Sequence, residues 1–87
     1  MKKRLAWIDS RNKVRIHPKV RADPKHFKGV KVHMETFQKE RAAGASRKQA
    51  IHIANREEHK AVGAHTLGQI RSYELGNARL EREIKKA

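Results

Sequence analysis

Residues 41–60, RAAGASRKQAIHIANREEHK, hold the end of one helix, a glycine turn and the start of a second helix. Gly44 can adopt the left-handed conformation in which many helices end. Ser46 and Gln49 have the S-x-x-Q spacing of a capping box, in which each side chain bonds the other residue's backbone N–H. The stretch therefore predicts two helices joined by a tight turn, the second of them over residues 47–60.

The first of these helices is predicted over residues 24–43. Asp23 followed by Pro24 is a favourable N-cap and first-turn pair. Apolar residues then recur at the 3-4-3 spacing of one helical face, at Phe27, Val30, Met34 and Phe37. Before residue 33 the pattern also fits a strand, because a glycine at position 29 is followed by alternating valines. Residues 24–32 are therefore open between helix and strand, with helix favoured.

A third helix is predicted over residues 67–86, because Thr66 and Gln69 repeat the capping-box spacing. Its apolar stripe has a 3-4-3-4 spacing and includes one polar position: Ile70, Tyr73, Asn77, Leu80 and Ile84. The stripe is similar to a short coiled-coil seam, which leaves open a dimer through this helix. Two heptads are few, so we expect the stripe to pack on the other helices instead. A break at Gly76 and Asn77 is the alternative to one continuous helix.

Residues 4–17 have the alternation of a β-hairpin, with strands over residues 4–8 and 13–17. The turn formers Asp9-Ser10-Arg11-Asn12 separate the strands, and Pro18 ends the second strand because it has no N–H to donate. An isolated hairpin is only marginally stable in water, so it must rest on the helices. We expect Trp7 to be its core anchor rather than a platform on which bases stack.

The predicted fold class is therefore α+β: an N-terminal β-hairpin packed on three helices in one small, mostly α-helical domain over residues 1–87. A chain of this length buries only about 60–65% of the surface that it exposes when unfolded, so the core is modest. Its expected members are Leu5, Trp7, Ile16, Phe27, Met34, Phe37, Ile53, Leu67, Ile70, Leu80 and Ile84.

The net charge is +13, and it is concentrated in the first part of the chain. Up to His33, eleven Lys and Arg stand against two Asp, whereas eleven stand against seven Glu from Met34 onward. Such uncompensated charge favours an anionic partner, and phosphate backbones are the commonest one in cells. A membrane surface is disfavoured because no strongly apolar helix face accompanies the basic run. The expected phosphate contacts are Arg11, Lys13, Arg15, Lys19 and Arg21.

The predicted helix over residues 47–60 has a polar, basic face opposite its apolar one. The candidate nucleic-acid contacts on this face are Lys48, His52, Asn55 and Arg56, with His59 one turn further on. Asn can bond adenine and Arg can bond guanine through two hydrogen bonds each. Most surface helices carry a solvated face with the same periodicity, so we expect limited sequence reading here.

The segment AAGASRKQAIHIA, residues 42–54, resembles the first two helices of the helix-turn-helix module of resolvases and many phage regulators. That resemblance implies a DNA-binding domain in which a short recognition helix follows a second tight turn. In this chain the connection over residues 55–64 is several residues longer, and Glu57 and Glu58 would repel phosphates. We therefore favour a packed helical pair that contributes charge and shape.

No catalytic pattern is present, so we expect neither an enzyme nor a cofactor. The six histidines lack the HExxH spacing, there is no cysteine, and no GxxxxGK[ST] phosphate loop occurs. Clustered carboxylates that could hold a divalent metal are also missing. A metal site is therefore not expected.

Three classes of function remain for a soluble, cytoplasmic protein of this composition. The favoured one is a small DNA-binding protein that contacts phosphates, and its size and charge are common among phage and mobile-element proteins. The second is an RNA- or ribosome-associated protein, although the aromatic RRM motifs and the GxxG loop of KH domains are absent. The third is a phage-type inhibitor that docks its basic face on an acidic host protein.

Overall fold

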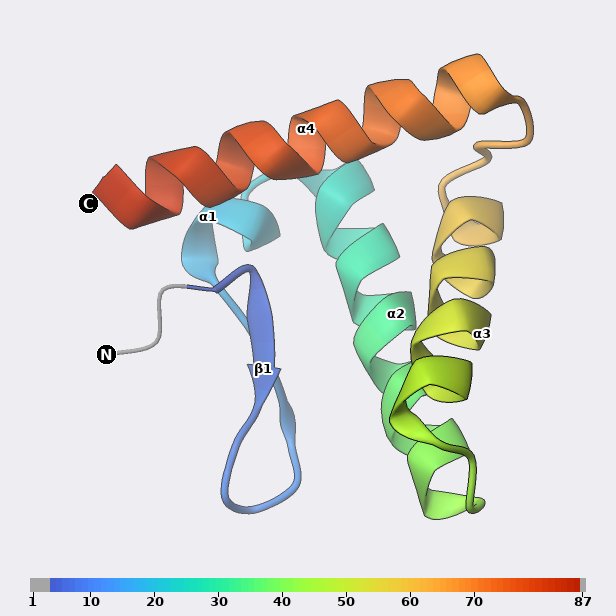
Figure 1. The fold of residues 1–87 in the computed structure, drawn as a ribbon. Coiled ribbons are helices and arrows are strands. Elements are labelled where there is room, and N and C mark those ends of the chain that lie inside the picture. The colour runs from blue at the N-terminus through green and yellow to red at the C-terminus, as the bar shows by residue number, and fades with distance from the viewer. Residues whose placement is uncertain (1–3, 87) are drawn as a thin grey trace.

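The fold combines one small β-hairpin with four helices, and the computed structural model describes residues 4–86 (Figure 1). The hairpin consists of β1 (Ala6–Ile8) and β2 (Val14–Ile16). The helices are α1 (Pro18–Arg21), α2 (Pro24–Ala42), α3 (Arg47–Ala61) and α4 (Leu67–Lys86). The predicted α+β class, with a hairpin packed on a mostly helical domain, is confirmed.

The elements form a flat molecule of 35 × 33 × 19 Å. Helices α2 and α3 pack side by side as a helical hairpin, and the β-hairpin lies on the other side of α2 (Figure 1). Helix α4 extends across the ends of the other helices.

The chain folds locally where its capping residues predict. Ser46 Oγ accepts from the Gln49 N–H at 3.2 Å while Gln49 Oε1 accepts from the Ser46 N–H at 3.1 Å. Thr66 and Gln69 form the same reciprocal pair at 3.2 and 3.1 Å. Residues 24–32 are helical, and α4 is unbroken at Gly76. Both open alternatives are thereby decided in favour of continuous helices.

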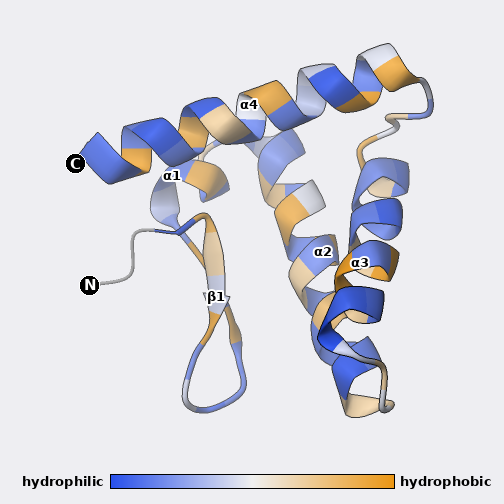
Figure 2. Ribbon diagram, viewed as in Figure 1, coloured by the Kyte–Doolittle hydropathy of each residue, from blue (hydrophilic) through white to orange (hydrophobic). Residues whose placement is uncertain are grey.

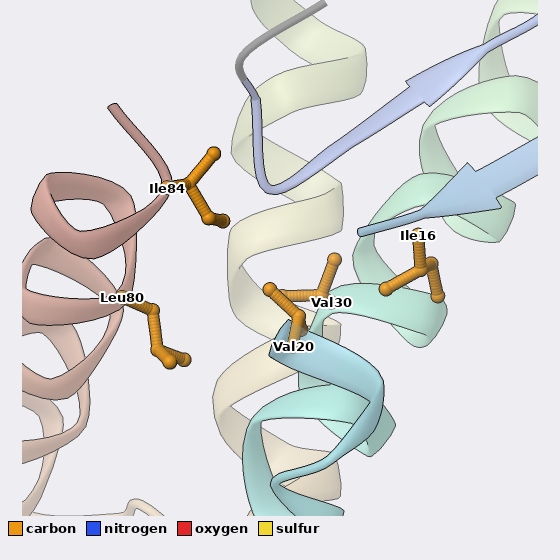
Figure 3. Packing of buried hydrophobic residues seen from close by; sticks show 5 residues of the cluster. All are labelled: Ile16, Val20, Val30, Leu80 and Ile84. Atoms are coloured by element: carbon orange, nitrogen blue, oxygen red, sulfur yellow. The ribbon is translucent and has the colours of Figure 1, made fainter. Parts of the chain in front are cut away.

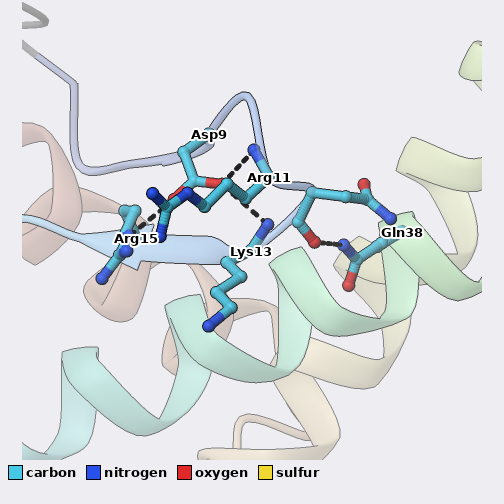
Figure 4. A network of polar contacts seen from close by, with 6 residues as sticks. Asp9, Arg11, Lys13, Arg15 and Gln38 are labelled. Atoms are coloured by element: carbon cyan, nitrogen blue, oxygen red, sulfur yellow. Dashed lines mark hydrogen bonds and ion pairs between the residues drawn. The ribbon is translucent and has the colours of Figure 1, made fainter.

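The hairpin has a short antiparallel ladder in which Ala6 pairs with Ile16, Trp7 with Arg15 and Ile8 with Val14. Its loop turns at Asn12, which has a φ of 62°, a conformation that Asn tolerates better than most residues. Gln38 of α2 donates a hydrogen bond to the Asn12 carbonyl (Figure 4). This bond ties the hairpin loop to α2.

The buried apolar cluster draws on four of the six elements and joins the hairpin to α1, α2 and α4. Its members are Ile16 of β2, Val20 of α1, Val30 of α2, and Leu80 and Ile84 of α4 (Figure 3). Elsewhere the ribbon is mainly hydrophilic, with hydrophobic residues interspersed along each helix (Figure 2). The core is small, as the length and composition predicted.

Helix α1 was not predicted, since the sequence analysis placed no element between the hairpin and residue 24. Pro18 begins this turn because its φ is already helical, and His17 Nδ1 accepts from the Lys19 N–H at 3.2 Å. The turn places Val20 at 0% exposure in the core. Val20 was missing from the expected core because a single apolar residue between basic ones gives no periodic signal.

The expected core was correct for Ile16, Leu80 and Ile84 but wrong for Leu67, which is 86% exposed. Leu67 is the first residue of α4 and precedes the stretch that reaches the other helices. Seven others are half-buried: Leu5, Trp7, Phe27, Met34, Phe37, Ile53 and Ile70. Trp7, the expected anchor, lies outside the buried cluster and the residues packed directly on it.

Candidate nucleic-acid interface

Every lysine and arginine between Arg4 and Lys86 has an exposed side chain. Within that described part of the chain, only Arg15, Lys60 and Lys85 lie within ion-pair distance of a carboxylate. The other basic groups therefore keep their charge uncompensated at the surface. This is the electrostatic condition for binding a polyanion.

The hairpin loop is organised by one carboxylate, that of Asp9 (Figure 4). Asp9 Oδ1 accepts from the backbone N–H groups of Arg11 and Lys13, both at 2.9 Å. The backbone N–H of Lys13 and the hydrogen bond from Arg15 lower the pKa of the Asp9 carboxyl. Asp9 is thus held as an anion that fixes the loop, while the side chains of Arg11 and Lys13 remain exposed.

Arg15 differs from its two neighbours. Its Nε donates to Asp9 Oδ2 at 2.8 Å, although its side chain is still 53% exposed. Arg15 is thus the basic residue of the hairpin that has an acidic side-chain partner. Asp9 compensates this one guanidinium, which leaves Arg11 and Lys13 as the uncompensated pair of the hairpin.

Lys19 and Arg21 extend the basic surface along α1. Lys19 Nζ lies 3.4 Å from the backbone oxygen of Glu83 in α4. The Arg21 guanidinium carbon lies 5.2 Å from the centroid of the Phe27 ring, which is within cation–π distance. Both residues are exposed and carry no carboxylate partner among residues 4–86. They are accessible to phosphates beside the hairpin.

The outer face of α3 presents the other four predicted contacts: Lys48, His52, Asn55 and Arg56 are all exposed. Lys48 and His52 line an open concavity of about 600 Å³ together with Ala45, Gln49 and Ile53. His59 does not share this face, because its Nε2 lies 3.3 Å from Glu74 Oε1 of α4. The exposed face is therefore polar and basic.

The acidic pair is less of an obstacle to DNA than the sequence suggested. Glu58 is only 7% exposed and lies on the inner side of α3, so it does not face a ligand of the outer face. Glu57 Oε2 lies 3.6 Å from Lys60 Nζ. Glu57 is therefore the one member of the pair that could repel a phosphate, and Lys60 partly neutralises its charge.

The inner side of α3 contributes a buried polar cluster that sequence analysis missed. The Tyr73 hydroxyl donates to Glu58 Oε2, and Asn77 Nδ2 donates to the same oxygen at 3.4 Å. His26 stacks on the Tyr73 ring with centroids 4.9 Å apart. Burial and the hydrogen bond to Glu58 raise the pKa of Tyr73. These contacts join α2, α3 and α4, so the cluster is structural.

His33 of α2 borders this cluster. Its Nδ1 lies 2.9 Å from Glu58 Oε1, although the alignment is not that of a hydrogen bond. Within residues 4–86, no group of three or more His, Asp or Glu side chains has a geometry that could hold a metal ion.

A cleft of about 340 Å³ opens between β1, α2 and the start of α3. We call it the hairpin cleft. It is lined by Arg4, Ala6, Trp7, Ile8, His33, Met34, Phe37, Arg47 and Ile51. Sequence analysis did not find it, because its residues come from three separate segments. The available signal was that Trp7 and Phe37 are two of only four aromatic residues in the chain.

The helical pair does not complete the helix-turn-helix module. Helices α2 and α3 pack side by side (Figure 1), and the next helix, α4, is 20 residues long. Tyr73, Leu80 and Ile84 of α4 are buried against the rest of the chain rather than presented on a short recognition helix. The predicted interpretation as a packed helical pair describes this arrangement.

None of the helices between residues 4 and 86 combines the length and apolar character needed to cross a bilayer. Comparison of the chain with protein-family models, with characterised proteins and with solved structures returned no match. The surface of the described residues carries exposed basic groups on the hairpin, α1 and α3, and a cleft between hairpin and helices.

Proposed function

We propose that the protein is a non-enzymatic, cytoplasmic nucleic-acid-binding protein that contacts DNA through its phosphates with limited sequence reading. The observation that carries the proposal is the exposure of every Lys and Arg in residues 4–86, of which only three have carboxylate partners. Binding releases the counterions condensed on the nucleic acid and removes the self-repulsion of the free protein.

The hairpin and α1 supply the principal phosphate contacts in this proposal. Arg11 and Lys13 are exposed on a loop whose shape Asp9 fixes, so the loop loses little conformational freedom on binding. Lys19 and Arg21 continue the same basic segment, and α3 adds Lys48 and Arg56 on a second surface. Charge and shape account for affinity, while Asn55 and Arg56 offer the limited contact with base edges.

A salt titration tests the proposal. The slope of log K against log salt reports the number of phosphates neutralised, and each Lys or Arg contact contributes about one unit. The double replacement of Arg11 and Lys13 by Ala should reduce the slope for duplex DNA by up to about two units. Circular dichroism of the variant checks that its helices persist.

The matched control is the double replacement of Lys60 and Lys85 by Ala. It removes the same amount of positive charge, but each of these lysines already has a glutamate partner, at 3.6 and 3.2 Å. The control should leave the slope nearly unchanged. Equal effects of the two double variants would contradict a contact surface on the hairpin.

Parallel titrations identify the partner. Duplex DNA, structured RNA and an acidic polypeptide are titrated under the same salt conditions. Tightest binding to structured RNA would move the assignment to an RNA- or ribosome-associated protein. Binding to the acidic polypeptide alone would favour an inhibitor that docks on an acidic protein, and the DNA proposal would then be wrong.

A further inference from the structure

The hairpin cleft exposes apolar side chains alongside charged and polar ones. Trp7, Met34 and Phe37 are half-buried at its walls, and Ile51 is 36% exposed. Apolar groups that stay partly exposed in this way forgo stabilisation of about 25 cal/mol for each Å² left in water. The volume of the hairpin cleft, about 340 Å³, is at the small end of the range for sites that bind small ligands.

The same cleft carries positive charge at its walls. Arg4 and Arg47 both line it, and both side chains are exposed. Neither lies within ion-pair distance of a carboxylate among residues 4–86. A ligand that fills the cleft should therefore combine a flat apolar body with negative charge close to it.

The free edge of β1 adds hydrogen-bonding groups. The His17 N–H bonds the Leu5 carbonyl and the Asp9 N–H bonds the Lys13 carbonyl, both at 2.9 Å. Because bonded and non-bonded pairs alternate in an antiparallel ladder, Ala6 and Ile8 direct their N–H and C=O groups away from β2. Both residues line the cleft, so donors and acceptors are available to the edge of a ligand.

We propose that the hairpin cleft binds an unpaired nucleobase of a single-stranded segment, with the base against Trp7 and Phe37 and the adjoining phosphates on Arg4 and Arg47. This inference rests on the proposed function and names the form of nucleic acid that the cleft selects. Stacking suits any base because every base has a π-face, whereas a paired base inside a duplex is not available to the cleft.

A peptide strand is a poorer occupant of the cleft. Only Ala6 and Ile8 direct backbone groups to the free edge, so strand addition would gain few main-chain bonds. A nucleotide instead joins an aromatic plane to an anion within one residue. That combination matches aromatic residues flanked by two unpaired arginines.

The first experiment uses the wild-type protein, whose single tryptophan is Trp7. A short single-stranded oligonucleotide and an abasic strand of equal phosphate number are titrated while tryptophan fluorescence is recorded. Stacking should quench Trp7 with the base-bearing strand only and make that strand bind about 5- to 150-fold more tightly, the equivalent of one stacked base. Matched deoxyribose and ribose strands show whether DNA or RNA supplies the base.

The second experiment uses labelled strands and the variants Phe37→Leu and Trp7→Leu. Each should lower the affinity for the base-bearing strand about 5-fold or more and leave that for the abasic strand unchanged. Arg47→Gln should weaken both strands, and by more than Arg79→Gln, which removes an exposed arginine from α4 outside the cleft. Thermal unfolding of each variant identifies any loss of fold.

The outcomes separate the two proposals. Salt-dependent binding of both strands with equal affinity and an unchanged Trp7 signal would overturn the nucleobase site and leave phosphate binding intact. Equal quenching of Trp7 by an acidic polypeptide would also overturn it, because no base would be needed. Failure of every nucleic acid to bind would overturn the proposed function, and the nucleobase site with it.

Discussion

At the scale of single residues, two glycines allow the buried polar cluster to close. A Cβ on Gly29 would lie 2.0 Å from the Tyr73 hydroxyl oxygen and 2.9 Å from a Val62 methyl carbon. A Cβ on Gly76 would lie 2.6 Å from the His26 ring. Helix α2 therefore approaches Tyr73 of α4 more closely than any side chain at position 29 would permit.

Gly29→Ala should consequently destabilise the protein, although Ala is the better helix former by about 1 kcal/mol. The forced shift of Tyr73 should cost more, about 1–3 kcal/mol, as overpacking does elsewhere. Chemical denaturation measures the free energy of unfolding. The control is Gly68→Ala in α4, where the new Cβ would meet nothing within 4 Å. Equal effects of the two substitutions would contradict the close packing at Tyr73.

Tyr73 also makes stability depend on alkaline pH. Burial and the hydrogen bond to Glu58 raise its pKa above the ordinary value of 10.0, so the folded state favours the neutral phenol. This contribution is complete below pH 10 and is lost as pH rises above it, because the unfolded chain ionises first. The free energy of unfolding should therefore fall above pH 10.

Tyr73→Phe isolates this contribution from the titration of lysines. At neutral pH the variant should be less stable by about 1–3 kcal/mol, because Glu58 loses a hydrogen-bond donor. The difference from the wild type should shrink as pH rises above 10, as followed by denaturation at a series of pH values. A difference that stays constant with pH would show that Tyr73 ionises at the same pH in both states.

At the scale of elements, one face of α3 is buried and the opposite face is exposed. Ala50, Ala54 and Glu58 follow one another at intervals of four residues and are buried, while Lys48, His52, Asn55 and Arg56 are exposed on the outer side. The outer face is accessible to a ligand. Side chains that read base edges and side chains that bind phosphates are exposed alike.

Arg56→Ala tests whether the outer face of α3 reads bases or binds phosphates. We expect equal, modest losses of affinity on DNA duplexes of different sequence, measured by fluorescence anisotropy, because a phosphate contact is indifferent to the base. A loss of about 1–3 kcal/mol confined to particular sequences would instead make Arg56 a reader of guanine. No loss on any duplex would leave this face solvated. Arg79→Ala in α4 is the control for removal of one exposed charge.

At the scale of the whole molecule, one small cluster couples the hairpin to the helices. Ile16, Val20, Val30, Leu80 and Ile84 belong to four different elements, so none of these elements buries its apolar residue alone. The two-stranded ribbon and the single turn of α1 would not be stable without this contact. Unfolding should therefore be cooperative.

Leu80→Ala tests this coupling. Leu80 is 5% exposed, and its truncation should cost about 2–5 kcal/mol. That is a large share of the roughly 4–13 kcal/mol expected for a domain of this size. Trp7 fluorescence in the hairpin and helical circular dichroism should lose their native signals together. Leu75→Ala, at a residue 62% exposed, should change stability by less than about 0.5 kcal/mol. Separate transitions of the two signals would contradict a shared core.

The sequence by itself determined the elements, because their signals are local. Asp23, Ser46 and Thr66 cap the three long helices within three residues along the chain, and Asp9 organises the hairpin turn in the same way. The exposure of the basic residues was equally predictable, since a charged side chain without a partner is costly to bury. Every predicted nucleic-acid contact is exposed.

Only the tertiary structure decided how the faces combine. Tyr73 can reach Glu58 only because Gly29 has no side chain that would collide with the Tyr73 hydroxyl. Gly29 and Tyr73 are 44 positions apart in sequence. The approach of Phe37 and Arg47 to Trp7 likewise depends on where α2 places the hairpin. Periodicity reports which side of an element is apolar, but not which neighbour covers it. The hairpin cleft therefore had no local signal, because it exists only where three separate segments meet.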